Sequence, residues 1–330
     1  MRESRTFGKR KREELPQREV NIKYILLTEG TETEPQYFEA VEENKKQLGI
    51  PPIIKILPLM RSYGENGWSN PKKILDRLLL NLKESKTDKI SYSTLLNAMV
   101  DCLYYSEYLS KHKEKIPEIS RLLERVYRDV LKVSPADFVE DKEATVTKVT
   151  EFLAKEKPRI CELIIKNIGD ALNEQSIPYA PEIDKICLVV DRDPMSFTSS
   201  QYDYVKKTCA TNNVQFYISN PGFELWLLMH SSNFATMKDD LAAKFSTINP
   251  PEFLDHIESL LKQEFDGYNK TKLKTQPFMQ AIDTAVANEK MFAESVDALK
   301  NDMGSNVGLL IQEMRGQNIQ MMLLHLHSDK

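Results

Sequence analysis

Four short apolar runs stand out along the chain, each bounded by polar residues or proline. They cover residues 23–28, 53–58, 185–190 and 214–219. Runs of this length and composition predict short strands that are buried on both faces of a sheet. In most other segments, apolar residues recur at spacings of three and four, and the chain has only 11 glycines. We therefore expect most of the protein to be helical.

A helical pattern separates the two strands of each pair. It lies near residues 35–48 in the first pair and near residues 201–211 in the second. Each pair therefore predicts a strand–helix–strand unit, and strands that are apolar almost throughout are typical of a parallel sheet with helices on both faces. Two such units indicate a doubly wound α/β core.

The two units are far apart in the sequence. Residues 70–182 contain several amphipathic stretches, such as "PKKILDRLLLNL", and no convincing strand, so we interpret them as a helical insertion. The predicted organisation is a basic N-terminal tail (1–20), the first half of the core (21–69), the insertion (70–182), the second half of the core (183–232) and a helical C-terminal region (233–330).

Composition places the chain among ordinary globular proteins. It has 330 residues, 41% of them hydrophobic and 28% charged, with a formal net charge of −4, so it can bury a sizeable core without disulfides or metals as staples. This charge does not by itself indicate a nucleic-acid-binding protein, although a local basic groove is compatible with it. The basic cluster at residues 9–12 is either a phosphate contact or part of a solvated tail.

Cysteine usage and hydropathy bear on the compartment. The four cysteines are widely separated and show no metal-ligand spacing, which is typical of buried thiols in a reducing environment. No apolar run reaches 18 residues, and the N-terminus lacks the apolar centre of a signal peptide. We expect a cytoplasmic protein without a membrane span.

Carboxylates gather where two of the predicted strands end. Glu29, followed by Gly30, closes the first strand, and Asp191 and Asp193 close the third. The carboxyl ends of parallel strands border the ligand crevice of α/β folds, and a spacing of two places Asp191 and Asp193 on one side if the strand continues. Three converging carboxylates predict a hard divalent cation, Mg²⁺ or Mn²⁺; Ca²⁺ usually takes more oxygen ligands, and Zn²⁺ usually takes His or Cys.

A strand that closes on Glu-Gly and a later strand that closes on Asp-x-Asp resemble the TOPRIM domain of topoisomerases, primases and overcoming-lysogenization-defect nucleases. More closely, the segments "TEGTETEPQYF", "VVDRDPMSF" and "ISNPGFELWLLMH" resemble the three signature blocks of the RloB-like family. The resemblance covers mainly residues 18–60 and 183–315. The helical insertion departs from the compact family pattern.

The resemblance implies a TOPRIM-like core and a TOPRIM-type metal site. Glu29 would be a metal ligand or a general acid/base, and Asp191 and Asp193 would be metal ligands. RloB-like proteins occur with restriction loci and phage-defence modules, often beside an ABC-type or AAA-type ATPase. Their activity is generally inferred to be nucleolytic, and that inference is an analogy.

Three further residues are site candidates with two interpretations each. Glu34 either binds metal or forms a capping box with Thr31 at the start of the next helix, whereas Glu32 is expected to face solvent. Glu224 is either a second metal ligand or an exposed acidic residue at the start of a helix that Asn220 caps. Lys270 either stabilises charge in phosphoryl transfer or lies in a solvated loop.

The leading functional hypothesis is a Mg²⁺- or Mn²⁺-dependent nuclease that cleaves DNA or RNA, tRNA included. Its catalytic residues would be Glu29, Asp191, Asp193 and Lys270, and it would act as an effector of anti-phage defence or abortive infection with an ATPase partner. The alternative is a non-catalytic nucleic-acid- or nucleotide-binding subunit that docks the ATPase through its insertion. Primase-like nucleotidyl transfer ranks last, and homo-oligomerisation stays open.

Overall fold

One five-stranded sheet organises the fold. The structure is a computed structural model that describes residues 22–30, 32–59, 70–87, 89–106, 108–111, 115–174 and 179–316. The strand order is β2-β1-β3-β4-β5, and every neighbouring pair is parallel except β4 with β5. The strands are β1 (Ile22–Thr28), β2 (Ile54–Leu59), β3 (Lys185–Asp191), β4 (Val214–Asn220) and β5 (Gly304–Ser305). A mixed α/β fold is confirmed; β5, only two residues long, was not predicted.

Helices cover both faces of the sheet because the strands are apolar on both sides. Tyr24 and Leu26 of β1 belong to the core on one face, and Ile25 between them belongs to the core on the other. The first face packs against α1 (Thr33–Asn44), α9 (Phe223–Leu228) and α14 (Val307–Gly316), and the second against α2 (Pro71–Thr87) and α8 (Ser199–Thr211). This two-sided burial accounts for the near-continuous apolar runs in the sequence.

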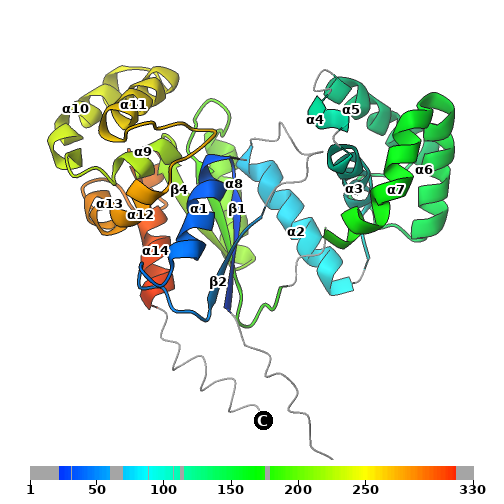
Figure 1. Cartoon of the computed structure of the whole chain (residues 1–330), viewed down its shortest axis with the longest axis horizontal. Coiled ribbons are helices and arrows are strands. Elements are labelled where there is room, and N and C mark those ends of the chain that lie inside the picture. Colours follow the sequence, from blue (N-terminus) through cyan, green and yellow to red (C-terminus); the bar gives the residue numbers. More distant parts are fainter. Residues whose placement is uncertain are drawn as a thin grey trace, which may run out of the picture.

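The C-terminal helices extend the first of these two cores (Figure 1). They are α10 (Phe234–Thr247), α11 (Pro250–Glu264), α12 (Gln276–Gln280) and α13 (Ile282–Glu289). The short 3₁₀ helix η4 (Ala298–Lys300) follows them, and its Leu299 belongs to the core on the other face. Asn249 caps α11 by accepting the amide proton of Glu252, which fits the preference of Asn for this position. The expectation of a helical C-terminal region agrees with these elements.

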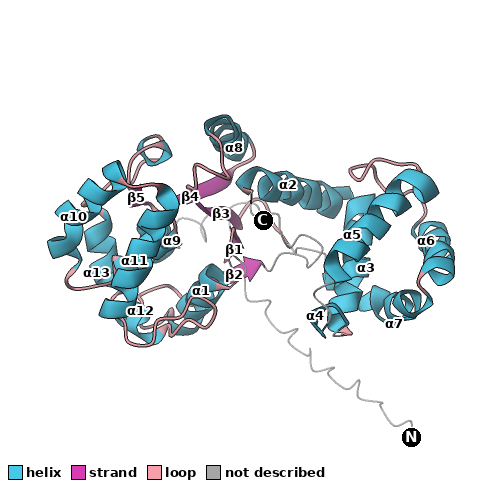
Figure 2. Cartoon of the chain, turned by 90° about the horizontal axis from the view of Figure 1, so that it is seen from above, coloured by secondary structure: helices cyan, strands magenta, loops and turns pink. Residues whose placement is uncertain are grey.

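The helices between β2 and β3 form a separate group. After α2 they are α3 (Tyr92–Tyr105), α4 (Tyr108–Lys111), α5 (Ile116–Arg125), the π-helix η3 (Val126–Leu131), α6 (Lys142–Glu156) and α7 (Pro158–Glu174). Helices α3–α7 pack around a hydrophobic core of their own, which includes Leu96, Met99 and Leu153. Figures 1 and 2 show this group to one side of the sheet, with α2 between them. That residues 70–182 form an insertion into the core stays a prediction, and so do the bounds of the other predicted regions.

All four cysteines are free and buried, as expected. Among the described residues, no helix combines the length and apolarity that crossing a bilayer requires. The basic tail at 1–20 lies outside the described residues, and so does Thr31.

The predicted cap at Asn220 is wrong. Asn220 is the last residue of β4, paired with Gly304 of β5, and its side-chain amide donates hydrogen bonds to the carbonyls of Leu299 and Asp302 at 3.0 Å each. Helix α9 begins two residues later than expected, with Gly222 at the N-cap. Pairing with β5, which the sequence did not reveal, keeps Asn220 extended.

Candidate functional site

The carboxyl ends of β1 and β3 lie side by side, and this brings Glu29 and Asp191 together. Thr28 pairs with Val189 in the parallel register, and the Glu29 amide donates to the Val189 carbonyl at 3.1 Å. The Glu29 carboxylate in turn accepts the amide proton of Asp191 at 3.1 Å through Oε2. The two residues, 162 positions apart in the chain, therefore share one edge of the sheet, as predicted.

A cavity of about 310 Å³ opens at this edge, and we call it the acidic cavity. Its walls carry five acidic side chains and, among the described lining residues, a single lysine. The lining residues are Glu29, Gly30, Glu32, Thr33, Glu34, Asp191, Phe223, Glu224, Lys270 and Thr271. Five of the six predicted site residues thus meet in one place, and the exposed Glu32 joins them.

Glu34 lies inside the site. Its Oε1 accepts the Gly30 amide proton at 2.8 Å, and the side chain is buried. A Cβ on Gly30 would lie 2.0 Å from Glu34 Oε2, so only glycine allows this contact. Burial, followed by the charge of Glu224, raises the pKa of Glu34 despite the opposing hydrogen bonds and Lys270. At the end of β1, Gly30 therefore lets the Glu34 carboxylate approach the backbone.

The surroundings of Asp191 strongly perturb its carboxyl group. Its pKa is raised well above the ordinary value, first by loss of hydration and then by the charges of Glu224, Glu29 and Glu34. Its Oδ1 accepts the Phe223 amide proton at 2.8 Å, at the first turn of α9. Like charges that meet in a poorly hydrated place need a proton or a cation to be stable.

Glu224 is buried, so the interpretation as an exposed residue at a helix start is wrong. The two apolar residues on either side of it, Phe223 and Leu225, belong to the core, and this holds the first turn of α9 inside the protein. Gly222 gives Glu224 room: a Cβ there would lie 2.9 Å from Glu224 Oε2 and 3.4 Å from Asp191 Oδ2. The small residue lets both carboxylates converge.

Lys270 pairs with Glu224 through its ammonium group. Burial lowers the pKa of Lys270, but the charges of Glu224, Glu258 and Asp191 outweigh it and raise the pKa above the ordinary value. The loop that carries Lys270 is fixed to α1, because the Thr33 hydroxyl donates to the Lys270 carbonyl at 2.9 Å and Gln36 accepts the Leu273 amide proton at 2.9 Å. The backbone of this loop is therefore held in place, while the Lys270 side chain lines the cavity and is still 53% exposed to solvent, so both interpretations of Lys270 hold in part.

Asp193 is the one predicted site residue that the structure does not bring to the cavity. Strand β3 ends at Asp191, so the period-two alternation does not reach residue 193. The Asp193 carboxylate instead accepts the Met195 amide proton at 2.9 Å and the Ser196 hydroxyl at 2.8 Å. It thereby closes the turn that leads into α8.

A protein-family model described as RloB-like protein matches residues 24–314, which is most of the chain. The chain belongs to the RloB-like family. Comparisons with curated proteins and with solved structures return no match.

The donor atoms of the acidic cavity in this RloB-like protein fit a divalent metal ion. Glu29, Glu34, Asp191 and Glu224 offer only carboxylate oxygens, the ligands that Mg²⁺ and Mn²⁺ prefer. In the arrangement described, no group of three or more His, Cys, Asp or Glu side chains is already set to hold a metal, and Glu224 is engaged by Lys270. Side-chain rotation at Glu224 and Lys270 would have to accompany metal binding.

Three residues that shape the site were not singled out from the sequence of this RloB-like protein. Gly222 makes room for the carboxylates, and Thr33 and Gln36 fix the loop of Lys270. The glycine in "NPGFELW" was a readable signal, because a Gly next to a buried Glu favours close approach to the backbone. The two α1 residues gave no signal, because their partners lie more than 230 positions away.

Proposed function

We propose that this RloB-like protein is a metal-dependent nuclease whose active site is the acidic cavity. One observation carries the proposal: carboxylates from the ends of β1 and β3 and from the first turns of α1 and α9 converge, together with Lys270, on one open cavity. Such a cluster is costly to assemble unless a cation compensates it. Hydrolysis of phosphodiesters is the reaction class that uses hard cations in acidic sites most directly.

Each residue has a role in this proposal. Glu29, Asp191 and Glu224 would hold the cation, and Glu34 would act beside them. Bound Mg²⁺ or Mn²⁺ supplies Lewis-acid polarisation of the scissile phosphate. Lys270, on its loop beside Glu224, is placed to neutralise charge on a phosphate oxygen.

Proton transfer falls to a carboxylate whose pKa lies above its ordinary value. Burial gives Glu34 this property, and a group that binds protons more readily is a better general base toward water. The Gly30 amide holds one Glu34 oxygen in place at 2.8 Å, which fixes the orientation of the other. Glu34 is therefore the residue we assign to accept a proton from the attacking water.

The test is a cleavage assay on labelled DNA and RNA, tRNA included, with Mg²⁺ or Mn²⁺. Wild type is compared with Glu29→Gln and Asp191→Asn, alone and with any ATPase whose gene is found beside that of this protein, and Glu289→Gln serves as a buried-carboxylate control outside the cavity. We expect metal-dependent cleavage by wild type and the control, and none by the two cavity variants. Equal cleavage by all four proteins, or cleavage by none under any condition, would refute the proposal.

The helices α3–α7 favour a second, compatible role in partner binding. They form their own hydrophobic core, and Ile165 of α7 exposes 58% of its surface. We propose that this group contacts the ATPase partner of a defence system, as in the alternative of a docking subunit. An Ile165→Glu variant tests this by co-purification: it should lose the ATPase and keep any metal-dependent cleavage.

A further inference from the structure

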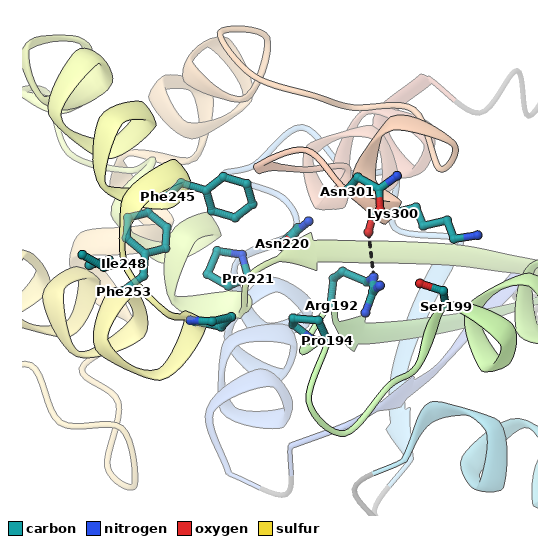
Figure 3. A pocket seen from close by; sticks show the side chains of 11 residues that line it. Arg192, Pro194, Ser199, Asn220, Pro221, Phe245, Ile248, Phe253, Lys300 and Asn301 are labelled. Atoms are coloured by element: carbon teal, nitrogen blue, oxygen red, sulfur yellow. Dashed lines mark hydrogen bonds between the residues drawn. The ribbon is translucent and has the colours of Figure 1, made fainter.

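A second cavity of about 330 Å³ lies at the ends of β3 and β4 (Figure 3). We call it the aromatic pocket. It is lined by Arg192, Pro194, Ser199, Asn220, Pro221, Phe245, Ile248, Pro250, Phe253, Lys300 and Asn301. Nothing in the proposed chemistry uses it, and its volume falls at the lower end of the range of small-molecule sites.

The two cavities share their dividing wall. Asp191 lines the acidic cavity, and Arg192, the next residue, lines the aromatic pocket. In the same way, Phe223 belongs to the first and Pro221 to the second. A ligand in one cavity is therefore separated from a ligand in the other by a single layer of chain.

One end of the aromatic pocket is apolar. Phe245 and Phe253 pack there with ring centroids 5.5 Å apart at 67°, and Ile248 lies beside them (Figure 3). Phe253 is buried, whereas Phe245 is only half-buried. The half-buried ring of Phe245 gives the pocket a surface on which a flat ligand can stack.

The opposite end is polar and basic. Figure 3 shows Arg192, Ser199, Lys300 and Asn301 there, with Asn220 and Pro221 in between. The Arg192 guanidinium is fixed by hydrogen bonds to the carbonyls of Lys300, at 2.9 Å, and Phe197, at 2.6 Å. Lys300 pairs with the exposed Asp203 at 2.7 Å. Fixed positive charge at one end and an aromatic surface at the other suit a ligand that is flat and joined to a phosphate.

We propose that the aromatic pocket binds a nucleobase of the same nucleic-acid strand whose phosphate enters the acidic cavity. This inference rests on the proposed function for its substrate class. The base would stack at Phe245, and its phosphate would lie toward Arg192 and Lys300. Because the cavities share a wall, neighbouring nucleotides of one strand can occupy both.

The experiment measures base binding without metal. Saturation-transfer NMR is recorded on the full-length protein in EDTA with each of the four ribonucleoside 5′-monophosphates, and with the corresponding nucleosides. We expect transfer to base protons with wild type, about tenfold weaker binding to Phe245→Leu, which removes the π-face, and binding to Phe245→Tyr close to that of wild type. The matched control is Phe292→Leu, at another half-buried ring that packs edge-on against a buried phenylalanine.

Two results would overturn the inference: no transfer to base protons of any nucleotide, or equal binding to Phe245→Leu and Phe292→Leu. Thermal melts of both leucine variants show whether a loss reflects unfolding, and Phe245→Tyr gives a second, better-packed variant. Because no metal and no cleavage enter this assay, the nuclease proposal can fail while base binding stands, and base binding can fail while cleavage stands.

Discussion

The structure contains the same local contact twice, in two very different surroundings. Glu34 accepts the amide proton of Gly30 at 2.8 Å, and Glu289 accepts the amide proton of Gly308 at 2.8 Å. In both pairs the glycine is sterically required, because a Cβ would lie 2.0 Å from Glu34 Oε2 and 2.3 Å from Glu289 Oε2. Each pair is a carboxylate pressed against a backbone amide where a side chain would block it.

The surroundings decide what each carboxylate can do. Glu34 lies in an open cavity with three other site carboxylates and Lys270. Glu289 has no exposed surface, and its Oε2 has no hydrogen-bond partner among the described atoms. Burial, reinforced by the charge of Glu294, raises the pKa of Glu289 to about 8. A closed site stabilises one carboxylate by a proton, whereas an open cluster of carboxylates offers room for a cation.

The largest expected effect is on cleavage activity, which should depend on the acidic cavity and not on Glu289. Asp191→Asn and Glu34→Gln should each lower metal-dependent cleavage by at least about 100-fold, because the first removes a charge that the cation needs and the second removes the proposed general base. Glu289→Gln should stay within about twofold of wild type, since it lies outside the cavity. Initial rates on a cleaved substrate check this. If folded Glu289→Gln lost as much cleavage activity as Asp191→Asn, the acidic cavity could not be told apart from the Glu289 site by function.

The same assay distinguishes the two aspartates of the DxD sequence. Asp193→Asn keeps an oxygen that can accept the Met195 amide proton, so we expect a loss of less than about tenfold. If Asp193→Asn were as inactive as Asp191→Asn, Asp193 would have to enter the metal site after all.

The second effect is on the pH dependence of stability. The raised pKa of Glu289 means that the folded protein holds a proton that the unfolded chain releases, so this group's contribution is fully present below about pH 4.5 and is lost as pH rises through about 8. Glu289→Gln removes the titrating group, so the variant should not lose this contribution to stability as pH rises. Relative to wild type, its free energy of unfolding should rise by on the order of 5 kcal/mol from pH 4.5 to above pH 8, at about 1.4 kcal/mol for each pKa unit between the folded and unfolded states. Urea unfolding across this pH range tests it; a difference independent of pH would contradict the assignment.

The third effect concerns the two glycines. Gly30→Ala and Gly308→Ala should each destabilise the fold by about 1–3 kcal/mol, because a buried carboxylate must shift to admit the methyl group. Only Gly30→Ala should also lower cleavage, by about tenfold or more, since it displaces Glu34. Gly316→Ala is the matched control, with nothing near its added Cβ, and should change stability by no more than about 0.5 kcal/mol. Thermal melts and cleavage rates of the three variants decide the point.

Much of the site could be predicted from local patterns. The β-strand runs gave β1 and β3 nearly to the residue, and parallel pairing then required Glu29 and Asp191 to meet. Glu34, Glu224 and Lys270 were candidates with a rival interpretation. Burial places Glu34 and Glu224 in the cavity, whereas the half-exposed Lys270 lines it through its ion pair with Glu224. Glu224 is buried because Phe223 and Leu225 pack into the core, and Glu34 is held in the cavity by its contact with Gly30. Local sequence does not show either feature.

The rest depended on contacts that are distant in sequence. Asp193 was placed with Asp191 on the assumption that β3 continued, but the strand stops and a hydrogen-bonded turn begins. Asn220 was expected to cap a helix, but the two-residue strand β5, 84 positions later, keeps it in the sheet. Glu289 gave no signal, because a glutamate in a helical pattern is ordinarily exposed.

The most direct test of the account is a calorimetric titration of Mn²⁺ into the metal-free protein, with Asp191→Asn and Glu289→Gln titrated alongside. The acidic cavity predicts saturable binding by wild type, affinity lower by at least about tenfold in Asp191→Asn, and unchanged affinity in Glu289→Gln. Circular dichroism confirms that the variants are folded. Mn²⁺ binding that is the same in wild type and Asp191→Asn, or absent from wild type, would contradict a metal site in the acidic cavity.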